Sequence, residues 1–276
     1  MNITEALNEG EKYLKDIKYS SSSKELRYIL SHLLNKDISY LFAHSEQKLS
    51  PLIEKKYIEI LNRRRRGEPL QYILGKTEFF GRDFIVNKNV LIPRQDTELS
   101  IEILLDIIKN NNIDSILDIG TGSGAVAITV NSESNINTTA CDISKKALEV
   151  ASDNAKLLHS NVLFIESNLF DNIDGTFDII YSNPPYIERK EIDNLQVEVK
   201  NFEPRLALDG GIDGLYFYKN IIKKAPFFLN KDGYLIFEIG YNQGHELVKL
   251  MCKNFETKIY KDLNNLDRVI VGKMRS

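Results

Sequence analysis

From Ser115 onward, short apolar runs alternate with segments of helical spacing, and this alternation restricts the fold more than any other feature of the chain. The apolar runs are 115–119, a run that ends at 142, and then 162–165, 177–181 and 234–238. Strands that alternate with helices form a mainly parallel sheet with helices on both faces. A final pair of strands is expected near 256–260 and 267–272. The sequence therefore predicts an α/β domain with a Rossmann-like sheet.

The first 67 residues contain helical patterns only. Apolar residues such as Ile3, Leu7 and Leu14 recur at helical spacing. Ser50 and Pro51 begin a later helix that runs into four consecutive arginines, 63–66. We therefore expect an all-helical domain over 1–67, a linker with a β-hairpin over 68–93, and the α/β domain over 94–276. We also expect the helical pattern to stop at Glu68.

Composition and charge exclude several classes of protein. A formal net charge of −3 gives no global basic field to hold nucleic acid. Neither a signal peptide nor an apolar run of membrane-spanning length is visible, so we expect a cytoplasmic protein without membrane contact. The spacing of the two cysteines fits neither a metal site nor a disulfide framework. The four histidines are scattered, so no metal is expected; they are His32, His44, His159 and His245.

A glycine-rich loop follows the first strand of the predicted sheet and opens a helix. It contains Asp118, Gly120, Thr121, Gly122, Ser123 and Gly124. Glycines let the backbone approach a ligand closely, and a helix N-terminus offers unpaired N–H groups. The spacing is GxGxG rather than the GxGxxG of dinucleotide sites, and Asp118 suits a cation better than a pyrophosphate. The loop therefore indicates a methyl-donor site; a nicotinamide site or a structural turn are the alternatives.

Two further segments fit the same ligand. Asp142 ends the next strand, where an acidic residue can bind both hydroxyls of a ribose. Asn168 and Leu169 follow the third strand, where the loop is expected to cover an adenine ring; a plain polar turn is the alternative. A nucleoside that carries a cationic amino acid and no phosphate, namely S-adenosylmethionine, fits all three segments.

A rigid tetrapeptide, Asn183-Pro184-Pro185-Tyr186, follows the strand at 177–181. Ligands of open α/β sheets bind at the carboxyl ends of the strands. The Asn183 side-chain oxygen and the Pro184 carbonyl provide two acceptors for the two hydrogens of an –NH₂ group. The Tyr186 ring can stack on a planar amide or base. The tetrapeptide therefore indicates a site that holds a planar –NH₂ group and directs its nitrogen at the donor. A proline-rich turn without function is the alternative.

The chemistry needs orientation rather than a strong base. An amide nitrogen is a poor nucleophile, so the site must align it with the methyl group at near-attack distance. The acceptors then stabilise the positive charge that grows on the nitrogen. The methylated amide is acidic enough to lose its proton without a dedicated base, and no histidine lies close to the tetrapeptide in the sequence.

Together these motifs resemble the release factor glutamine methyltransferases, the PrmC or HemK family. The resemblance runs along the whole chain and includes the glycine loop, the tetrapeptide and five further segments: 69–75, 78–81, 90–98, 202–204 and 238–240. The segment 92–98, which contains Arg94, is far more specific than the tetrapeptide, which DNA adenine methyltransferases share. The chain departs from the family at Gln95, where proline is usual, and at Asn168, where aspartate is usual.

The resemblance implies an enzyme that converts S-adenosylmethionine to S-adenosylhomocysteine without a metal. The methyl group goes to N5 of the glutamine in the Gly-Gly-Gln loop of class 1 peptide chain release factors. It also implies that Asn183 contacts both donor and substrate, that Arg94 lies on the substrate side with the tetrapeptide, and that the helical domain helps hold the release factor. Direct binding of nucleic acid is not expected.

Three alternatives remain open on the sequence. A methyltransferase that modifies a ribosomal-protein glutamine would use the same site chemistry. A nucleic-acid adenine N6-methyltransferase would need a basic surface, for which the arginines at 63–66 are the one candidate, although such runs are usually solvated. A binding module that kept only the fold is disfavoured, because the glycine loop and the tetrapeptide are both intact.

Overall fold

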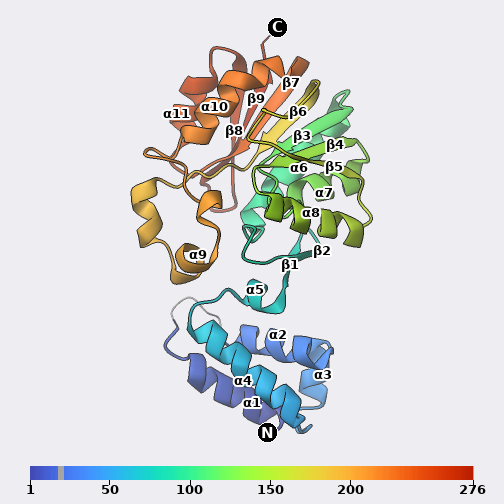
Figure 1. Ribbon diagram of the computed structural model, residues 1–276, viewed down its shortest axis with the longest axis vertical. Helices are drawn as coiled ribbons and strands as arrows, with labels where there is room; N and C mark the ends of the chain where they lie inside the picture. Colours follow the sequence, from blue (N-terminus) through green and yellow to red (C-terminus); the bar gives the residue numbers. More distant parts are fainter. Residues whose placement is uncertain (18–21, 276) are drawn as a thin grey trace. The chain divides into compact units, whose positions relative to one another are not determined.

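The computed structural model of the protein describes residues 1–17 and 22–275, and the chain divides into two compact units (Figure 1). The helical unit contains Met1–Gly75 and, in addition, Leu195–Phe202. The α/β unit contains Lys76–Asn194 and Glu203–Ser276. The chain therefore leaves the α/β unit once, after Asn194, and returns to it at Glu203.

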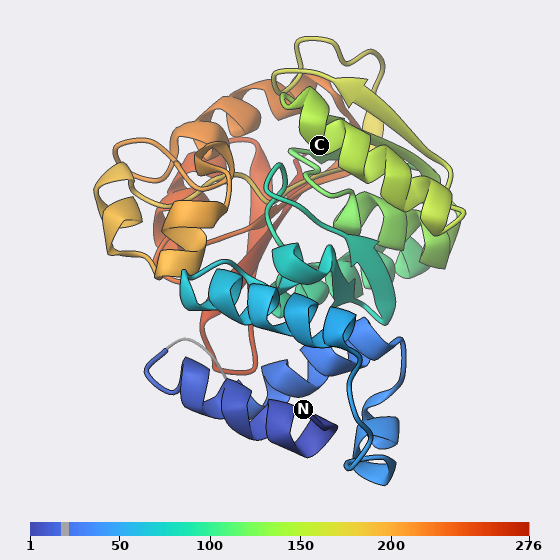
Figure 2. The same ribbon diagram turned by 60° about the horizontal axis from the view of Figure 1, so that its bottom comes forward.

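The helical unit buries the apolar faces of its helices against one another. Its helices are α1 (Ile3–Leu14), α2 (Ser22–Leu34), α3 (Ile38–Ala43), α4 (Pro51–Arg65), α5 (Leu70–Leu74) and α9 (Val197–Phe202). Figure 2 shows α1, α2 and α4 side by side, and Ile3, Leu30 and Tyr57 share their buried core. Asn2 caps α1 with its side chain and forms a capping box with Glu5, which satisfies N–H groups that the helix itself leaves unpaired. The all-helical character expected of this part of the chain is confirmed.

The helix pattern does not stop at Glu68 as the sequence predicted. A short helix, α5, covers Leu70–Leu74 and ends at Gly75. Pro69 stands at its N-cap, where the backbone N–H that proline lacks is not needed by the helix. A helix of five residues is too short to show a hydrophobic period in the sequence.

The four arginines at the end of α4 do not form one solvated basic face. Arg64 is 1% exposed and forms ion pairs with Glu25 on α2 and Glu198 on α9, at 2.8 and 2.7 Å. Arg63 pairs with Glu68 at 2.6 Å, and Arg65 lies over the Tyr13 ring. The run therefore has an internal structural role at its second position, and it is not the uniform basic surface that the sequence suggested as a candidate.

The α/β unit begins with an antiparallel hairpin of β1 (Lys76–Phe79) and β2 (Arg82–Ile85), which turns at Phe80 and Gly81. Its main sheet has seven strands in the order β5-β4-β3-β6-β7-β9-β8. The parallel strands are β3 (Ser115–Ile119), β4 (Asn137–Asp142), β5 (Val162–Glu166), β6 (Phe177–Ser182) and β7 (Leu229–Glu238). The antiparallel ending consists of β8 (Phe255–Lys261) and β9 (Asp267–Met274). The predicted Rossmann-like sheet is confirmed.

Helices cover both faces of this sheet (Figure 1). The helices of one face are α6 (Glu98–Asn110), α7 (Ala125–Ser134) and α8 (Lys145–Leu157), and those of the other are α10 (Tyr216–Lys224) and α11 (Gly244–Met251). Neighbouring residues of β7 point to opposite faces of the sheet. Ile236 packs in the hydrophobic core on the first face, and Leu235 and Phe237 pack in the core on the second. This period of two follows from the pleat of a strand.

The segment between the tetrapeptide and α10 carries short elements that the sequence did not predict. They are the 3₁₀ turns η2 (Arg189–Asn194) and η3 (Arg205–Ala207), with α9 between them; two further turns, η1 (Gln95–Thr97) and η4 (Ala225–Phe227), precede α6 and follow α10. Elements of three to six residues are too short to show a hydrophobic period. In the part of the chain that the structure describes, none of the helices combines the length and the apolarity needed to cross a membrane.

Candidate functional site

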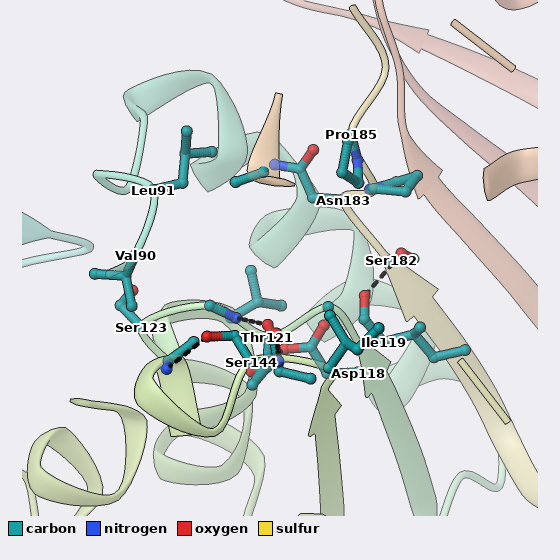
Figure 3. Close-up of a pocket in the computed structure, with 18 of the residues that line it drawn as sticks. Val90, Leu91, Asp118, Ile119, Thr121, Ser123, Ser144, Ser182, Asn183 and Pro185 are labelled. Carbon is teal, nitrogen blue, oxygen red and sulfur yellow. Dashed lines mark hydrogen bonds between the residues drawn. The ribbon is translucent and has the colours of Figure 1, made fainter. Parts of the chain in front are cut away.

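A single cavity at the carboxyl ends of the parallel strands brings together most of the residues that the sequence singled out (Figure 3). Because β3, β4 and β6 are parallel neighbours, the loops that follow them meet at one edge of the sheet. The predicted residues that line the cavity are Arg94, Asp118, Gly120, Thr121, Gly122, Ser123, Asp142, Asn168, Leu169, Asn183, Pro184 and Pro185. In Figure 3, Asn183 and Pro185 lie on one side and Val90 and Leu91 on another, with Asp118, Thr121 and Ser144 along the floor.

Two of the predicted residues lie next to this cavity rather than on its wall. Gly124 begins α7, and a side chain there would place its Cβ 2.8 Å from Ile128 Cδ1 and 3.1 Å from the Ala151 Cβ. Its place is thus explained by the close packing of α7 and α8. Tyr186 is half-buried. The hydrogen bond that fixes the tetrapeptide here is accepted by its backbone carbonyl and does not involve its ring.

The glycine loop is tied to the end of β4 by hydrogen bonds and leaves open space beside its backbone. The backbone N–H groups of Gly120 and Thr121 both donate to the Cys141 carbonyl, at 2.8 and 3.0 Å, which ties the loop to the end of β4. Gly120 and Gly122 have φ of 76° and 57°, a region that favours glycine. A Cβ atom at either position would meet nothing within 4 Å. The loop therefore leaves space for a ligand against its backbone.

Two carboxylates flank this space, one buried and one half-buried. Asp118 is 2% exposed and accepts a hydrogen bond from the Thr121 hydroxyl at 2.7 Å. Asp142 accepts from the backbone N–H groups of Gly122 and Ser144, at 2.9 and 2.8 Å, so one oxygen holds the glycine loop and the other holds the start of α8. Each oxygen has a second lone pair for a ligand hydroxyl or ammonium group.

The electrostatics of these acids suit a cationic ligand. Burial raises the pKa of Asp118 to about 7. The hydrogen bond from Thr121 opposes this increase, and the charge of the nearby Asp142 adds to it. Burial also raises the pKa of Asp142, although hydrogen bonds from Ser144 and Gly122 oppose it. A buried carboxylate such as Asp118 normally has an ion-pair partner, and none is found for it in the described part of the chain. The ammonium and sulfonium groups of S-adenosylmethionine would supply the missing positive charge.

Donor affinity is therefore expected to increase with pH below neutrality. Only ionised Asp118 attracts a cation, so a pKa of about 7 makes binding about fivefold tighter at pH 7 than at pH 6. Below pH 7 the donor's own amino group stays charged, so it adds no opposing change. Calorimetry at both pH values measures the effect, and Asp118→Asn should bind weakly with little pH dependence. Equal wild-type affinity at the two pH values would remove Asp118 from the cation site.

The loop predicted to cover the adenine ring is held in a defined conformation. Asn168 donates from Nδ2 to the Asp171 carboxylate at 3.2 Å, and its Oδ1 atom takes no part in this bond. The Ser167 hydroxyl donates to the Leu169 carbonyl at 2.9 Å and fixes a left-handed residue, since Leu169 has φ of 54°. Phe170 is buried below and stacks on Phe228. Asn168 and Leu169 thus reach the cavity on a rigid turn.

The tetrapeptide backbone is fixed by a side chain that the sequence did not single out. Gln243 donates from Nε2 to the Tyr186 carbonyl at 3.0 Å and to the Gly214 carbonyl at 3.2 Å. Its Oε1 accepts from the Gly240 N–H at 2.9 Å, so both ends of the amide are used. No sequence signal marked Gln243, because a lone glutamine belongs to no motif and its contact is long-range.

Gly210 lets a second segment pack directly against the tetrapeptide. A Cβ atom there would lie 2.8 Å from the Pro185 carbonyl oxygen and from the Tyr186 backbone. Gly210→Ala must therefore displace the tetrapeptide, and we expect a loss of about 1–3 kcal/mol in the free energy of unfolding together with slower methyl transfer. Chemical denaturation and steady-state kinetics measure the two effects. A variant with wild-type stability and turnover would show that the packing is not tight at this point.

Arg94 is positioned by a buried acid. Its guanidinium pairs with Glu203 Oε1 at 2.6 Å, and the Glu203 side chain is 1% exposed while that of Arg94 is 39% exposed. Burial raises the pKa of Glu203, and the neighbouring Arg94 opposes that increase. Glu203 lies in the family-like segment 202–204, so a sequence signal existed, but it gave no role for the residue. Within residues 1–17 and 22–275, no group of three or more His, Cys, Asp or Glu side chains could hold a metal ion.

Comparison with known proteins assigns both parts of the chain. Residues 5–75 match the PrmC N-terminal domain, and residues 86–204 match the methyltransferase small domain. The release factor glutamine methyltransferase of Fusobacterium nucleatum is 42% identical over 274 residues, which cover 96% of this chain and 77% of that protein. That of Koribacter versatilis is 37% identical over 276 residues, or 99% of both chains.

A solved methyltransferase structure from Pyrococcus furiosus shares the fold, with a TM-score of 0.52 and 18% identity over 71% of this chain and 90% of that chain. The fold, the extent of the matches and their identity point to one conclusion. This chain belongs to the family of release factor glutamine methyltransferases.

Proposed function

We propose that the protein transfers a methyl group from S-adenosylmethionine to N5 of the glutamine in the Gly-Gly-Gln loop of peptide chain release factors. One observation carries this proposal: the cavity joins buried Asp118, half-buried Asp142 and an open glycine loop to the rigid Asn183 tetrapeptide. The choice of a release factor as substrate is supported by the names of the related proteins. S-adenosylmethionine would supply an activated methyl group and leave as S-adenosylhomocysteine.

The donor is proposed to lie along the glycine loop. Asp118 attracts its charged amino acid part, and the backbone at Gly120 and Gly122 takes the close contact that only glycine permits there. Asp142 accepts hydrogen bonds from the ribose hydroxyls, while Asn168 and Leu169 hold the adenine. Thr121 and Ser123 complete the loop, and Gly124 supports it from α7.

The target amide is proposed to lie against the tetrapeptide. The Asn183 oxygen and the Pro184 carbonyl accept its two N–H groups, and because these acceptors are fixed before the substrate binds, they cost little reorganisation. They stabilise the positive charge that develops on the nitrogen. Pro185 keeps the backbone rigid, Tyr186 anchors it through its carbonyl, and Arg94 at the rim contacts the substrate chain.

The helical part of the chain is proposed to dock the release factor, with residues 1–67 as the docking domain, 68–93 as the linker and 94–276 as the catalytic domain. A Gly-Gly-Gln loop alone offers a small area, whereas specific protein complexes usually bury much more. Because Arg64 is buried, an acidic patch of the partner would have to be met by other residues, such as the exposed Arg65 and Arg66.

The direct test is transfer of labelled methyl from S-adenosylmethionine to purified candidates, followed by mapping of the methyl by mass spectrometry. Candidates are an intact release factor, the same factor with its Gly-Gly-Gln glutamine replaced, ribosomal proteins and an adenine-containing oligonucleotide. We expect methyl on the release factor glutamine and none on the replaced factor. Methyl on a ribosomal protein alone, or on the oligonucleotide, would replace the proposed substrate.

A further inference from the structure

A buried glutamate, Glu238, stands beside Asn183 at the edge of the sheet. Strands β6 and β7 are parallel neighbours, and their last aligned residues are Ser182 and Phe237. Asn183 and Glu238 are the next residues on the two strands, so their side chains emerge side by side. Glu238 is 2% exposed, although it ends a strand that otherwise buries apolar residues. A buried carboxyl at this place needs a reason, because burial of a charge is costly.

The surroundings of Glu238 leave one of its oxygens available. The side chains of Thr97 and Asn183 lie close enough to lower the pKa of the carboxyl by hydrogen bonding, and the positive charge of Arg268 on β9 lowers it as well. Its Oε2 atom is buried and has no hydrogen-bond partner in the described part of the chain. The backbone is held as well, since the Tyr218 hydroxyl donates to the Glu238 carbonyl at 2.8 Å. The backbone that carries the carboxyl is therefore held in place, and the Oε2 atom can still accept a hydrogen bond from a neighbouring group.

The chemistry of the two groups decides which way the Asn183 amide points. An ionised carboxylate can only accept hydrogen bonds, whereas an asparagine side chain has a donor end and an acceptor end. Beside ionised Glu238, Asn183 must present its –NH₂ end. Its oxygen is then directed away from the carboxylate and remains free to accept a hydrogen bond from another group. The opposite orientation would place two acceptors together and leave the –NH₂ end of Asn183 facing the –NH₂ of the substrate.

We infer that Glu238 is a positioning residue for methyl transfer: its carboxylate orients the Asn183 amide so that the oxygen accepts from the target –NH₂ group. The inference rests on the proposed function of Asn183. A hydrogen bond to a charged acceptor also polarises the asparagine amide, which increases the negative charge on its oxygen. That oxygen then stabilises the positive charge on the target nitrogen more strongly. Glu238 itself does not touch the reacting atoms.

The protonation state of Glu238 should control this orientation. Burial raises its pKa to about 7. Hydrogen bonding to Thr97, the charge of Arg268 and hydrogen bonding to Asn183 oppose this increase, whereas the charge of Asp96 adds to it. The other ionisable groups that interact with its charge are phenols, Tyr181, Tyr186 and Tyr218, and burial raises the pKa of each. A protonated Glu238 can donate to the Asn183 oxygen and so block it. Turnover should therefore increase as pH rises through about 7.

The test is Glu238→Gln in the full chain, with release factor as substrate and S-adenosylmethionine at saturation. Glutamine keeps the shape but can donate as well as accept, so it does not fix the asparagine. We expect kcat to fall at least about tenfold, the lower end for a lost charge-assisted hydrogen bond in the transition state. KM for the release factor and donor affinity should stay within about twofold, and the increase of kcat near pH 7 should disappear. Glu246→Gln, an exposed carboxyl on α11, serves as the matched control.

A double variant separates positioning from a general effect on the site. If Glu238 acts through Asn183, then Asn183→Ala with Glu238→Gln should be no slower than Asn183→Ala alone. The single Asn183→Ala variant should also lose the pH dependence near 7, and this measurement holds even if Glu238→Gln does not fold. Wild-type kcat in Glu238→Gln, additive losses in the double variant, or a pH dependence that survives in Asn183→Ala would each overturn the inference.

Failure of this inference is distinguishable from failure of the proposed function. The wild-type reaction alone decides the substrate, by the position of the methyl group. The ratio of variant to wild-type kcat is then measured on whichever substrate the wild type methylates. A ratio near one on a confirmed release factor rejects the role of Glu238 and leaves the proposed function intact.

Discussion

Asn183→Ala is expected to lower kcat by a factor of about 10² or more, the scale for loss of one preorganised hydrogen-bonding group in a transition state. Asn183 follows β6 directly, and the tetrapeptide that it begins is held by Gln243 and packed against Gly210. The backbone of the tetrapeptide is therefore fixed before the substrate arrives. Removal of the side chain takes away an acceptor that is most needed when the target nitrogen becomes positive, so the loss should fall on kcat rather than on KM.

Donor affinity should change little in the same variant, because the acids Asp118 and Asp142 lie at the carboxyl ends of other strands, β3 and β4. Single-turnover kinetics with saturating donor, together with calorimetry, separate the two effects. Asn194→Ala, an exposed asparagine outside the cavity, should behave as the wild type. Normal turnover in Asn183→Ala would exclude its assigned role, and a loss confined to donor affinity would place the residue in the donor site only.

Arg64→Ala is expected to destabilise the helical unit by about 3 kcal/mol, the lower end of the range for breaking a buried ion pair. The lower end applies because the two partners, Glu25 and Glu198, keep side-chain exposures of 16% and 17% and so remain partly hydrated. The arginine joins α4 to α2 and to α9, elements far apart in the sequence. Its loss leaves two carboxylates without the cation that they share.

Urea denaturation of the full chain, followed by circular dichroism, measures the effect. Arg66→Ala removes the same charge from an exposed position of the same run and should change the free energy of unfolding by less than about 0.5 kcal/mol. Equal stability of the two variants would mean that the ion pairs of Arg64 contribute nothing. For the same reason, deletion of residues 1–67 removes packing partners of Leu195–Phe202 and is not a clean test of docking.

The sequence by itself determined the sheet and the motifs that follow its strands. Local patterns are sufficient for this, because a period of two or of 3.6 residues reflects which face of a strand or helix is buried. The acids at 118 and 142 lie at the carboxyl ends of their strands and the tetrapeptide at 183–186 directly follows one, and parallel strands bring such positions to one edge. Their meeting in one cavity therefore required no knowledge of side-chain packing.

The sequence could not determine the residues that hold these groups in place. Gln243 reaches the Tyr186 carbonyl across 57 residues of chain, and Gly210 matters only because another backbone lies against it. The role of Glu238 depends on the alignment of β6 with β7, which no local pattern encodes.

The arginine run shows the same limit most clearly. Four identical side chains in sequence are indistinguishable by composition, yet Arg64 is buried between two glutamates while Arg66 is exposed to solvent. The helical period turns successive residues to different faces, and only the packing of α2 and α9 decides which face meets an acid. Strand order and ligand loops thus follow from local patterns, whereas ion pairs and supporting hydrogen bonds depend on long-range contacts that only the tertiary structure creates.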